Sequence, residues 1–459
     1  MTDLAKLIKA YDVRGVVPDE FNEDLARQIG AAFARLVDAE AVIIVRDMRP
    51  SSVPLSQAFA EGVTSQGLNV IDAGLGSTDL LYFAAGHLNL PGAVFTASHN
   101  PAQYNGIKMC LAGAAPVGQD TGLGDIRRML EEGIPAGPVH RGSVTHRDLL
   151  AEYAAYLRSL VDLTAIRPLK VVADAGNGMG GHMVPAVLGD AIMSALPLSI
   201  VPLYFELDGT FPNHEANPLE PANLVDLQKA VVEHGADIGL AFDGDADRCF
   251  VIDQNGDAVP PSAIVALIAT RELAKAPGAA VVYNVITSKA VPEIVAEHGG
   301  TAVRERVGHS FMKATMARHD AIFGGEHSGH YYFRDFWRAD TGMLAAMHVL
   351  AALGGQDRPL SELTGDYTRY HASGEINSEV ADVAATLDAV TAHFAGKGIS
   401  ADRIDGVTIE LPSGWFNLRP SNTEPVLRLN VEAATTGEMI RIRDEVLSLV
   451  HGSSSSADR

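Results

Sequence analysis

The sequence predicts an α/β protein of several domains. Short apolar runs alternate with amphipathic stretches in three successive parts of the chain, which begin near residues 1, 146 and 259, and this alternation is typical of α/β domains. The last part differs, because strand-like runs at 406–411 and 426–432 precede one helix at 436–450. A chain of 459 residues is long enough for three or four domains.

The charge balance restricts the classes of partner. The chain has 35 Lys and Arg against 57 Asp and Glu, a formal net charge of −22. An acidic chain does not attract nucleic acid or an anionic membrane, so we expect neither as a partner. Two cysteines cannot form a disulfide framework, and we see no secretory signal or membrane-spanning apolar run. These features favour a cytoplasmic protein.

The first part of the chain leads to a polar loop, Thr96–Pro101. The expected elements before it are strands at 10–15, 41–45 and 68–72, helices at 24–36 and 79–87, and a strand that ends at Phe95. The turn in the loop should leave Ser98 exposed at a strand tip, with His99 beside it, where α/β folds place chemistry. Asn105-Gly106 predicts a turn before a strand at 107–109.

The second part contains a glycine fingerprint. We expect a helix at 146–160 and a strand at 169–173, followed by Gly176–Gly181, which contains G-x-G-x-x-G. With Glu206 as the ribose-binding acid, this pattern could indicate a dinucleotide site. The fingerprint alone is weak evidence, and no hydride-transfer residues accompany it. A tight turn between strand and helix is therefore the favoured interpretation.

Three aspartates follow the strand expected at 236–242. Asp243, Asp245 and Asp247 alternate with small residues, so their carboxylates can surround one hard cation such as Mg²⁺ or Ca²⁺. The spacing is not that of an EF-hand, because Arg248 and Gln254 stand where its glycine and glutamate would be. A solvated acidic turn is the alternative. Since Mg²⁺ usually also takes a phosphate oxygen, a phosphate in the same site is expected.

Two later loops carry groups that suit a phosphorylated sugar. In the third part we expect helices at 262–273 and 289–298, a strand at 280–285, and loops at 306–313 and 324–330. Glu326 and Ser328 can bind vicinal hydroxyls, and His330 can carry a proton near neutral pH. Metal binding by His327 and His330 is a weaker alternative. The loop Arg419–Thr423 offers a guanidinium, hydroxyls and an amide, which suit a phosphate.

These four loops together resemble the signature loops of the α-D-phosphohexomutase superfamily. The similarity runs from Tyr11 to about Arg428, in family order, and is greatest to bacterial phosphomannomutase/phosphoglucomutase. It implies three related Rossmann-like α/β domains with mixed sheets, and a TATA-binding-protein-like α+β domain, around a central cleft. The implied domains are 1–143, 144–254, 255–366 and 367–451. The low-complexity run at 452–456 predicts a disordered tail at 452–459.

The resemblance also implies roles. Ser98 would be the phosphoserine and, with Asp243, Asp245 and Asp247, would hold Mg²⁺. Arg14, Lys108 and Arg248 would surround the transferred phosphoryl group. His99 and His330 would assist proton transfer. Substrate binding would fall to Glu326, Ser328, His309, Lys313, Arg419, Ser421, Asn422 and Thr423. The implied reaction interconverts hexose 1-phosphate and hexose 6-phosphate through a bound hexose 1,6-bisphosphate, and the hexose is mannose or glucose.

Physical chemistry supports this set of residues, because phosphoryl transfer depends on positioning and on neutralised charge. Two positions depart from some dual-specificity members: His327 replaces Met, and Ile286 replaces Lys. The alternatives are phosphoglucosamine mutase, disfavoured by Thr96 and His327, and an inactive sugar-phosphate-binding relative. The sequence leaves the preferred sugar open, and also whether the protein is a monomer or a dimer.

Overall fold

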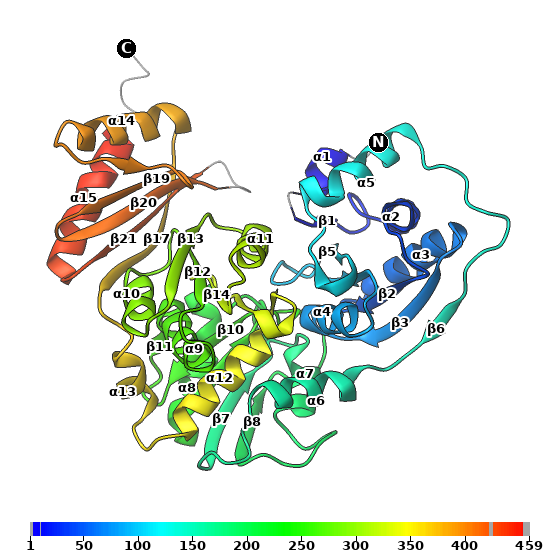
Figure 1. Ribbon diagram of the computed structural model, residues 1–459, viewed down its shortest axis with the longest axis horizontal. Helices are drawn as coiled ribbons and strands as arrows, with labels where there is room; N and C mark the ends of the chain where they lie inside the picture. The colour runs from blue at the N-terminus through cyan, green and yellow to red at the C-terminus, as the bar shows by residue number, and fades with distance from the viewer. Residues whose placement is uncertain (1–2, 10, 422–425, 453–459) are drawn as a thin grey trace. The chain divides into compact units, whose positions relative to one another are not determined.

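The computed structural model describes residues 3–9, 11–421 and 426–452 (Figure 1). It forms two compact units. Unit 1 comprises Met1–Pro261 and Ser328–Leu363, and unit 2 comprises Ser262–His327 and Thr364–Arg459. Within the described ranges, none of the helices is both long enough and apolar enough to cross a membrane.

The first sheet of unit 1 is mixed, with the strand order β1-β5-β4-β2-β3-β6. Strands β4, β2, β3 and β6 run parallel, and β5 pairs antiparallel with both β1 and β4. The strands are β1 (Val13–Val16), β2 (Ala41–Arg46), β3 (Asn69–Leu75), β4 (Gly92–Phe95), β5 (Tyr104–Cys110) and β6 (Val144–His146). The helices are α1 (Leu4–Leu7), α2 (Glu23–Leu36), α3 (Ser52–Ser65), α4 (Thr78–His87) and α5 (Leu123–Glu132).

Local sequence explains these elements. The apolar run of β2 is buried on both faces, as expected for a central parallel strand. Helix α2 begins where the Asn22 side chain accepts a hydrogen bond from the Leu25 N–H, and Glu23 and Asp24 occupy its first turn. The apolar face of α2 packs on α3 in one buried cluster with the sheet.

Two sequence expectations are wrong in this sheet. Asn105-Gly106 is not a turn but part of β5, where a Cβ on Gly106 would lie 2.1 Å from the carbonyl oxygen of Val13 on β1. The glycine therefore permits close pairing of two strands. Residues 144–146 are strand β6 paired with β3, and the helix expected from His146 begins only at Leu150.

The second sheet of unit 1 has the order β11-β10-β9-β7-β8, parallel at β9-β7-β8 and antiparallel elsewhere. Its strands are β7 (Leu169–Asp174), β8 (Leu198–Leu203), β9 (Ile238–Phe242), β10 (Cys249–Asp253) and β11 (Ala258–Val259). The accompanying elements are α6 (Leu150–Leu160), α7 (Gly180–Val187), α8 (Val225–His234), the antiparallel pair β15 (Tyr331–Phe333) and β16 (Ala339–Asp340), and α12 (Gly342–Gly354).

A buried carboxylate joins three helices of unit 1. Asp79 on α4 accepts hydrogen bonds from the Tyr153 hydroxyl on α6 at 2.7 Å and from Thr341, the N-cap residue of α12, at 2.6 Å. Burial raises the pKa of Asp79 to about 6, although these hydrogen bonds oppose the rise. The network fixes the start of α4, which lies beside the Asp245 loop.

Unit 2 contains a parallel strand group and an antiparallel sheet. In the first, β12 pairs with β13 and with β14, and its elements are α9 (Pro261–Lys275), β12 (Ala280–Asn284), α10 (Ala290–Glu297), β13 (Thr301–Glu305), α11 (His309–His319) and β14 (Phe323–Gly325). Helix α13 (Leu360–Gly365) leads to the sheet β17-β21-β20-β19-β18, whose elements are β17 (His371–Glu379), α14 (Val383–Ala395), β18 (Ala401–Asp402), β19 (Val407–Leu411), β20 (Gly414–Pro420), β21 (Val426–Ala433) and α15 (Thr436–Gly452).

The α/β class with mixed sheets is confirmed, and unit 2 also corrects some details. Its last sheet has five strands, of which only β19 and β21 were expected. Strand β17 escapes notice because it is mostly exposed and almost without apolar residues. Arg419 belongs to β20 instead of a loop, and the stretch 306–313 contains the start of helix α11 at His309.

The close approach of β1 and β5 should make the stability of the protein sensitive to a side chain at Gly106. Gly106→Ala should destabilise the protein by about 1–3 kcal/mol, because the new methyl group overlaps the Val13 carbonyl. Scanning calorimetry should show a lower melting temperature. Gly437→Ala in α15 is the control, since nothing lies within 4 Å of its Cβ and alanine favours a helix. Equal melting temperatures for the two variants would contradict the packing argument.

Candidate active site

Ser98 lies beyond the end of β4, as expected, but it is buried and not exposed, with only 3% of its surface accessible. Its hydroxyl donates a hydrogen bond of 2.8 Å to Oδ2 of Asp243. A Cβ on Gly244 would lie 2.4 Å from the Ser98 carbonyl oxygen, so the aspartate loop packs directly against Ser98. The prediction that Ser98 is exposed is wrong, because the aspartate loop that buries it lies 145 residues later in the chain.

The Ser98 backbone adopts an uncommon conformation. Its φ of 49° is left-handed, which costs energy for any residue with a Cβ. The Ser98 N–H donates to the Thr96 hydroxyl at 2.8 Å, and this bond supports the conformation from one side. Such local strain is maintained only where the surroundings over-determine it, and it is typical of functional sites.

Three carboxylates converge beside Ser98. Asp243, Asp245 and Asp247 follow β9, are at most 1% exposed, and have carboxylate oxygens within 4.8 Å of one another. Within the part of the chain that the structure describes, Oδ1 of Asp245 and Oδ1 of Asp247 have no hydrogen-bond partner. Buried carboxylate oxygens without partners are costly unless a cation satisfies them. Oxygen-only ligands suit a hard divalent cation, so this cluster can hold a metal ion.

Two cations from different segments partly neutralise the cluster. Lys108 Nζ on β5 lies 2.7 Å from Asp245 Oδ2 and 2.5 Å from Asp247 Oδ2. Arg248 Nε lies 3.0 Å from Asp243 Oδ2, and its Nη2 donates to the Ser98 hydroxyl at 3.2 Å. The Ser98 oxygen is therefore flanked by one carboxylate and one guanidinium.

These neighbours set the pKa values of the aspartates. Burial and Asp247 raise the pKa of Asp243 to about 8, against the opposing effect of Arg248. Burial also acts to raise the pKa of Asp245 and of Asp247, but the neighbouring groups that stabilise the carboxylates, with Lys108 the strongest of them, together outweigh it, and both pKa values fall below their ordinary value. Of the three groups, Asp243 is thus the one that retains a proton most readily.

Arg14 and His99 complete the surroundings of Ser98. Arg14 on β1 donates to the Asn100 side chain at 2.6 Å and forms an ion pair with Asp12 at 2.5 Å. His99 Nδ1 lies 3.3 Å from the Ser98 hydroxyl and also contacts the Arg248 guanidinium. Burial, together with the charge of Arg248, holds the pKa of His99 well below its ordinary value.

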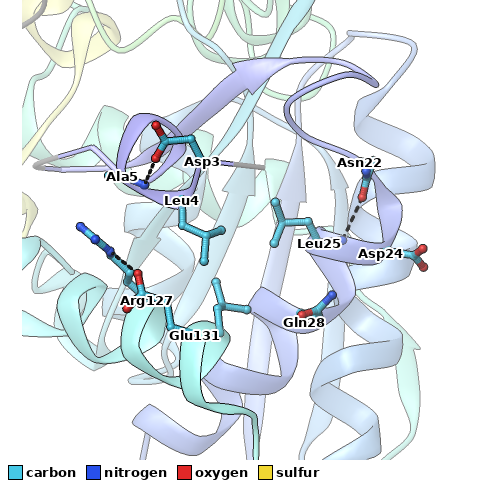
Figure 2. Close-up of a pocket in the computed structure, with 10 residues that line it drawn as sticks. Asp3, Leu4, Ala5, Asn22, Asp24, Leu25, Gln28, Arg127 and Glu131 are labelled. Atoms are coloured by element: carbon cyan, nitrogen blue, oxygen red, sulfur yellow. Dashed lines mark hydrogen bonds and ion pairs between the residues drawn. The ribbon is translucent and has the colours of Figure 1, made fainter. Parts of the chain in front are cut away.

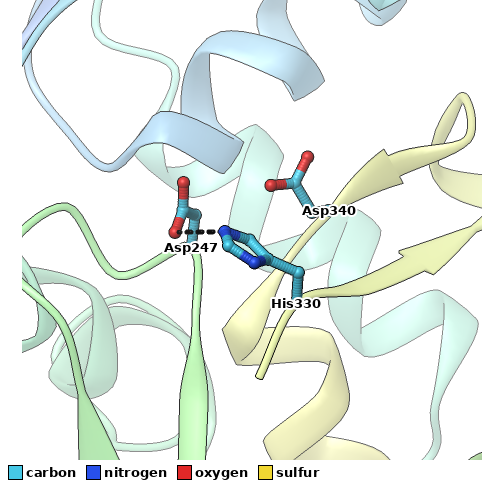
Figure 3. Close-up of side chains that lie close together, drawn as sticks. All are labelled: Asp247, His330 and Asp340. Carbon is cyan, nitrogen blue, oxygen red and sulfur yellow. Dashed lines mark ion pairs between the residues drawn. The ribbon is translucent and has the colours of Figure 1, made fainter. Parts of the chain in front are cut away.

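His330 lies on the other side of the carboxylates, between Asp247 and Asp340 (Figure 3). Its Nε2 is 3.7 Å from Asp247 Oδ1, and its Nδ1 is 3.1 Å from the Ser328 hydroxyl. Asp340, on β16, is buried and was not expected from the sequence, because no motif surrounds it. Unit 1 thus brings together all the residues expected near the phosphoserine, and Ser328 with them.

The remaining expected residues belong to unit 2. Glu326 is buried, and its Oε1 accepts hydrogen bonds from the Asn284 amide at 2.9 Å and from the Gly308 N–H at 3.2 Å. Gly308 is the N-cap residue of α11, which carries His309 and Lys313. The segment that carries Glu326 and the start of α11 are therefore joined by one carboxylate.

The expected phosphate loop is described only in part. Arg419 on β20 is buried and pairs with Glu375 at 3.1 Å. The Ser421 N–H donates to the Val426 carbonyl at 2.9 Å. Asn422 and Thr423 lie outside the described residues.

The glycine fingerprint has a packing explanation. A Cβ on Gly178 would lie 2.8 Å from the carbonyl oxygen of Gly244, to which the Met179 N–H donates at 2.9 Å. The glycine-rich turn therefore lets two backbones meet and supports the aspartate loop, as the tight-turn interpretation requires.

Two further residues contact the site without having been expected. The Thr78 hydroxyl, at the start of α4, donates to Asp245 Oδ2 at 2.5 Å. The buried Arg49 donates to the Ser98 carbonyl at 3.0 Å. The polar run Arg46–Ser52 was visible in the sequence, but nothing local indicated a contact nearly 50 residues later in the chain.

A separate pocket of unit 1 has no part in this site (Figure 2). It has a volume of about 630 Å³ and is lined by residues of α1, α2 and α5, among them Leu4, Leu25 and Leu130. Two of its charged residues, Arg127 and Glu131, pair with each other at 2.8 Å. None of the expected site residues lines it.

Comparisons with known proteins agree with the geometry. Four family models match, described as phosphoglucomutase/phosphomannomutase alpha/beta/alpha domains I, II and III and C-terminal domain, over residues 5–133, 151–256, 260–370 and 375–449. A phosphomannomutase of Salmonella montevideo is 41% identical over 452 residues, covering 96% of this chain and 98% of that protein.

Two further relatives extend the comparison. A protein named phosphohexose mutases, from Xanthomonas campestris, is 40% identical over 447 residues, covering 97% of this chain and 99% of its own. The crystal structure of a phosphoglucomutase/phosphomannomutase family protein from Burkholderia thailandensis superposes with a TM-score of 0.88 at 32% identity, covering 98% of each chain. The chain therefore belongs to the phosphoglucomutase/phosphomannomutase family, and its function is that of a phosphohexomutase.

Proposed function

We propose that this phosphohexomutase interconverts hexose 1-phosphate and hexose 6-phosphate, with mannose or glucose as the sugar, through phosphorylated Ser98. The observation that carries the proposal is the setting of the Ser98 hydroxyl, 2.8 Å from Asp243 and 3.2 Å from Arg248, next to three buried carboxylates. Similarity to proteins named phosphomannomutase supports the sugar.

The reaction proceeds in two transfers. First the bond between the phosphorus and Ser98 Oγ breaks while a bond forms to the free hydroxyl of the hexose monophosphate, which loses its proton to a base. The product is the hexose 1,6-bisphosphate, which turns over in the site. Ser98 Oγ then attacks the other phosphorus, and the sugar oxygen that leaves takes up a proton. Each transfer conserves the phosphoryl group, so the bisphosphate is also the activator that loads the enzyme.

The carboxylates and cations have separate tasks in this proposal. Asp243, Asp245 and Asp247, with the phosphate on Ser98, would hold Mg²⁺, which neutralises charge on the transferred group. Lys108 and Arg248 already balance two negative charges of the cluster. Arg14, on the neighbouring strand, would face the phosphoryl oxygens with its guanidinium.

Two histidines are the proposed proton carriers. His330 would take the proton from the attacking sugar hydroxyl, since its imidazole lies beside Asp247 at the edge of the carboxylate cluster. His99 would serve Ser98 itself. Its imidazole Nδ1, 3.3 Å from the Ser98 hydroxyl, would accept a hydrogen bond from that hydroxyl and so assist proton transfer there.

Substrate binding is assigned by the family resemblance. Glu326 and Ser328 would bind the sugar hydroxyls on C3 and C4. His309 and Lys313 would make further contacts with the ligand. The phosphate that does not react would be bound by Arg419, Ser421, Asn422 and Thr423. The buried, rigidly bonded Glu326 supports this role, because a binding carboxylate must be held in place.

The proposal includes the domain limits 1–143, 144–254, 255–366 and 367–451, and a cytoplasmic location, which the two buried free cysteines favour. The alternatives are a phosphoglucosamine mutase and an inactive sugar-phosphate-binding relative. A coupled assay with mannose, glucose and glucosamine 1-phosphates distinguishes all three.

Phosphorylation of Ser98 is the first test. Purified protein treated with glucose 1,6-bisphosphate should gain one phosphate, mapped to Ser98 by peptide mass spectrometry. Ser98→Ala should lose both the phosphate and turnover, because no other hydroxyl among the described residues lies between Asp243 and Arg248. Ser56→Ala, at a buried serine of α3 whose hydroxyl bonds only within its own helix, to the Val53 carbonyl, among the described residues, is the matched control, and this variant should keep the phosphate on Ser98. Phosphate on another residue of the active enzyme would refute the assignment.

The metal site has its own test. Asp245→Asn should weaken Mg²⁺ binding by more than about tenfold, because it replaces one charged ligand by a neutral one. Titration calorimetry with Mg²⁺ alone measures the affinity. Asp162→Asn, at an exposed aspartate that bonds Thr164, should leave the Mg²⁺ affinity unchanged. An unchanged Mg²⁺ affinity in Asp245→Asn would exclude Asp245 as a ligand.

Sugar specificity should be broad. Mannose and glucose differ only at C2, whereas Glu326 and Ser328 are assigned to hydroxyls that both share. His327 is the polar residue nearest in sequence to both residues, but its Nδ1 already lies 2.9 Å from the Ser262 hydroxyl, so this nitrogen is not free to bind the sugar hydroxyl on C2, whose oxygen is O2. A binding site discriminates strongly against a substrate only when that substrate leaves buried polar groups of the site without a partner.

We therefore expect kcat/KM for the two 1-phosphates to agree within about a hundredfold. Glu326→Ala should reduce both to a similar extent, while Glu297→Ala, at an exposed glutamate of α10, serves as the control. Initial rates with each sugar measure the ratio. A difference of several orders of magnitude would mean that O2 is recognised, and His327→Met would then identify the residue responsible.

A further inference from the structure

Arg49 is enclosed by the loop that carries Ser98. Its side chain has no accessible surface. Nη1 donates to the carbonyl oxygens of Pro101 at 2.8 Å and Tyr104 at 3.0 Å, and Nη2 donates to those of Ser98 at 3.0 Å and Asn100 at 2.6 Å. Three of these carbonyls, those of Ser98, Asn100 and Pro101, belong to the connection between β4 and β5, and the fourth belongs to Tyr104, the first residue of β5. One guanidinium therefore binds the Ser98 loop at several points along its length.

The guanidinium is itself held from two domains. On its own side, Asp47 Oδ2 lies 3.3 Å from Arg49 Nε, and Asp47 Oδ1 accepts hydrogen bonds from the Arg49 N–H and the Ser52 hydroxyl. On the other side, the Phe211 ring lies 4.9 Å from the guanidinium carbon. A Cβ on Gly209 would lie 2.6 Å from the Arg49 Cα, so the segment with Phe211 packs closely on it.

The hydrogen bonds of Arg49 act on the strained residue of the site. Ser98 has a left-handed backbone, and its two sides are fixed by Thr96, which accepts from its N–H, and by Arg49, which donates to its carbonyl. Release of the carbonyl would let Ser98 relax toward an ordinary conformation and move its hydroxyl away from Asp243. A displacement of about 1 Å in a reacting group can reduce a rate by about a hundredfold.

We propose that Arg49 is a positioning residue for phosphoryl transfer, which holds the Ser98 loop through four carbonyls so that Ser98 Oγ stays between Asp243 and Arg248. The inference rests on the proposed role of Ser98 as phosphoryl carrier. Arg49 contacts no reacting atom, so its effect should fall on the rate of transfer and not on substrate affinity.

Lysine cannot replace arginine in this position. The guanidinium presents a planar fork whose two Nη atoms reach two pairs of carbonyls, whereas an ammonium is a single donor centre on a flexible chain. Arg49→Lys keeps the charge beside Asp47 and much of the volume. The variant therefore removes the fork specifically.

Arg158 provides a matched control. It also donates to backbone carbonyls, those of Val187, Gly189 and Ser194 at 2.6–2.7 Å. None of these residues belongs to the candidate active site. Arg158→Lys therefore reproduces the loss of a carbonyl-binding fork in unit 1 without touching the Ser98 loop.

The experiment compares both variants with the wild-type enzyme. Full-length protein, loaded with phosphate by glucose 1,6-bisphosphate, is mixed with glucose 1-phosphate in a rapid-quench instrument, and steady-state constants and melting temperatures are measured in parallel. Arg49→Lys should lower kcat and the single-turnover transfer rate by about 30- to 300-fold with KM changed less than about threefold. Arg158→Lys should match its loss of thermal stability but keep kcat.

The outcomes separate the inference from the proposed function. A folded Arg49→Lys enzyme with wild-type kcat, in a protein whose Ser98 carries phosphate, overturns the inference alone. A wild-type enzyme that is active without phosphate on Ser98 overturns the proposed function first. If Arg49→Lys does not fold, Phe211→Leu replaces it, because this change loosens the guanidinium but keeps its donors. A fall in kcat of about threefold or more then supports the inference, and an unchanged kcat overturns it.

Discussion

Three buried aspartates within 4.8 Å of one another are the constraint on which unit 1 depends. Carboxylates so placed repel one another, and burial removes the water that would screen them. The fold meets this cost with Lys108 from the first sheet and with Arg248 from the aspartate segment itself. The site therefore cannot form within one domain. Strand β5, which carries Lys108, must pack against the loop after β9, which carries the aspartates. The contact between these two segments also buries Ser98.

This constraint explains why the loops at the junction are rich in small residues and backbone contacts. Gly244 approaches the Ser98 carbonyl, Gly178 approaches Gly244, and Gly209 approaches Arg49, each at a distance that excludes a Cβ. The hydrogen bond from Thr78 to Asp245 adds the N-terminus of α4 to the same assembly. Position at the reacting oxygen is thus maintained by contacts between domains, and a phosphohexomutase needs such positioning because phosphoryl transfer demands little other chemistry from the protein.

The sequence predicts the individual strands and motifs of the site better than the contacts between them. The strand before Ser98, the strand before the aspartates and the alternation of the α/β domains follow from apolar periodicity, and the motifs follow from family resemblance. What fails depends on distant contacts. Asn105-Gly106 has the local pattern of a turn, yet Val13 of another strand decides its conformation. Ser98 is buried by residues 145 positions later, and β17 has no apolar pattern that could reveal it. Arg49 and Asp340 carry no motif, so only their neighbours in space show what they contact.

The central claim is that Ser98 transfers the phosphoryl group in every catalytic cycle, and its most direct test is kinetic competence. Enzyme labelled with ³²P on Ser98 is mixed with saturating glucose 1-phosphate and quenched on the millisecond scale. The account predicts that label leaves the protein and appears in hexose bisphosphate at a rate no slower than kcat. Transfer slower than kcat would show that phosphorylated Ser98 is not on the reaction path and would contradict the account.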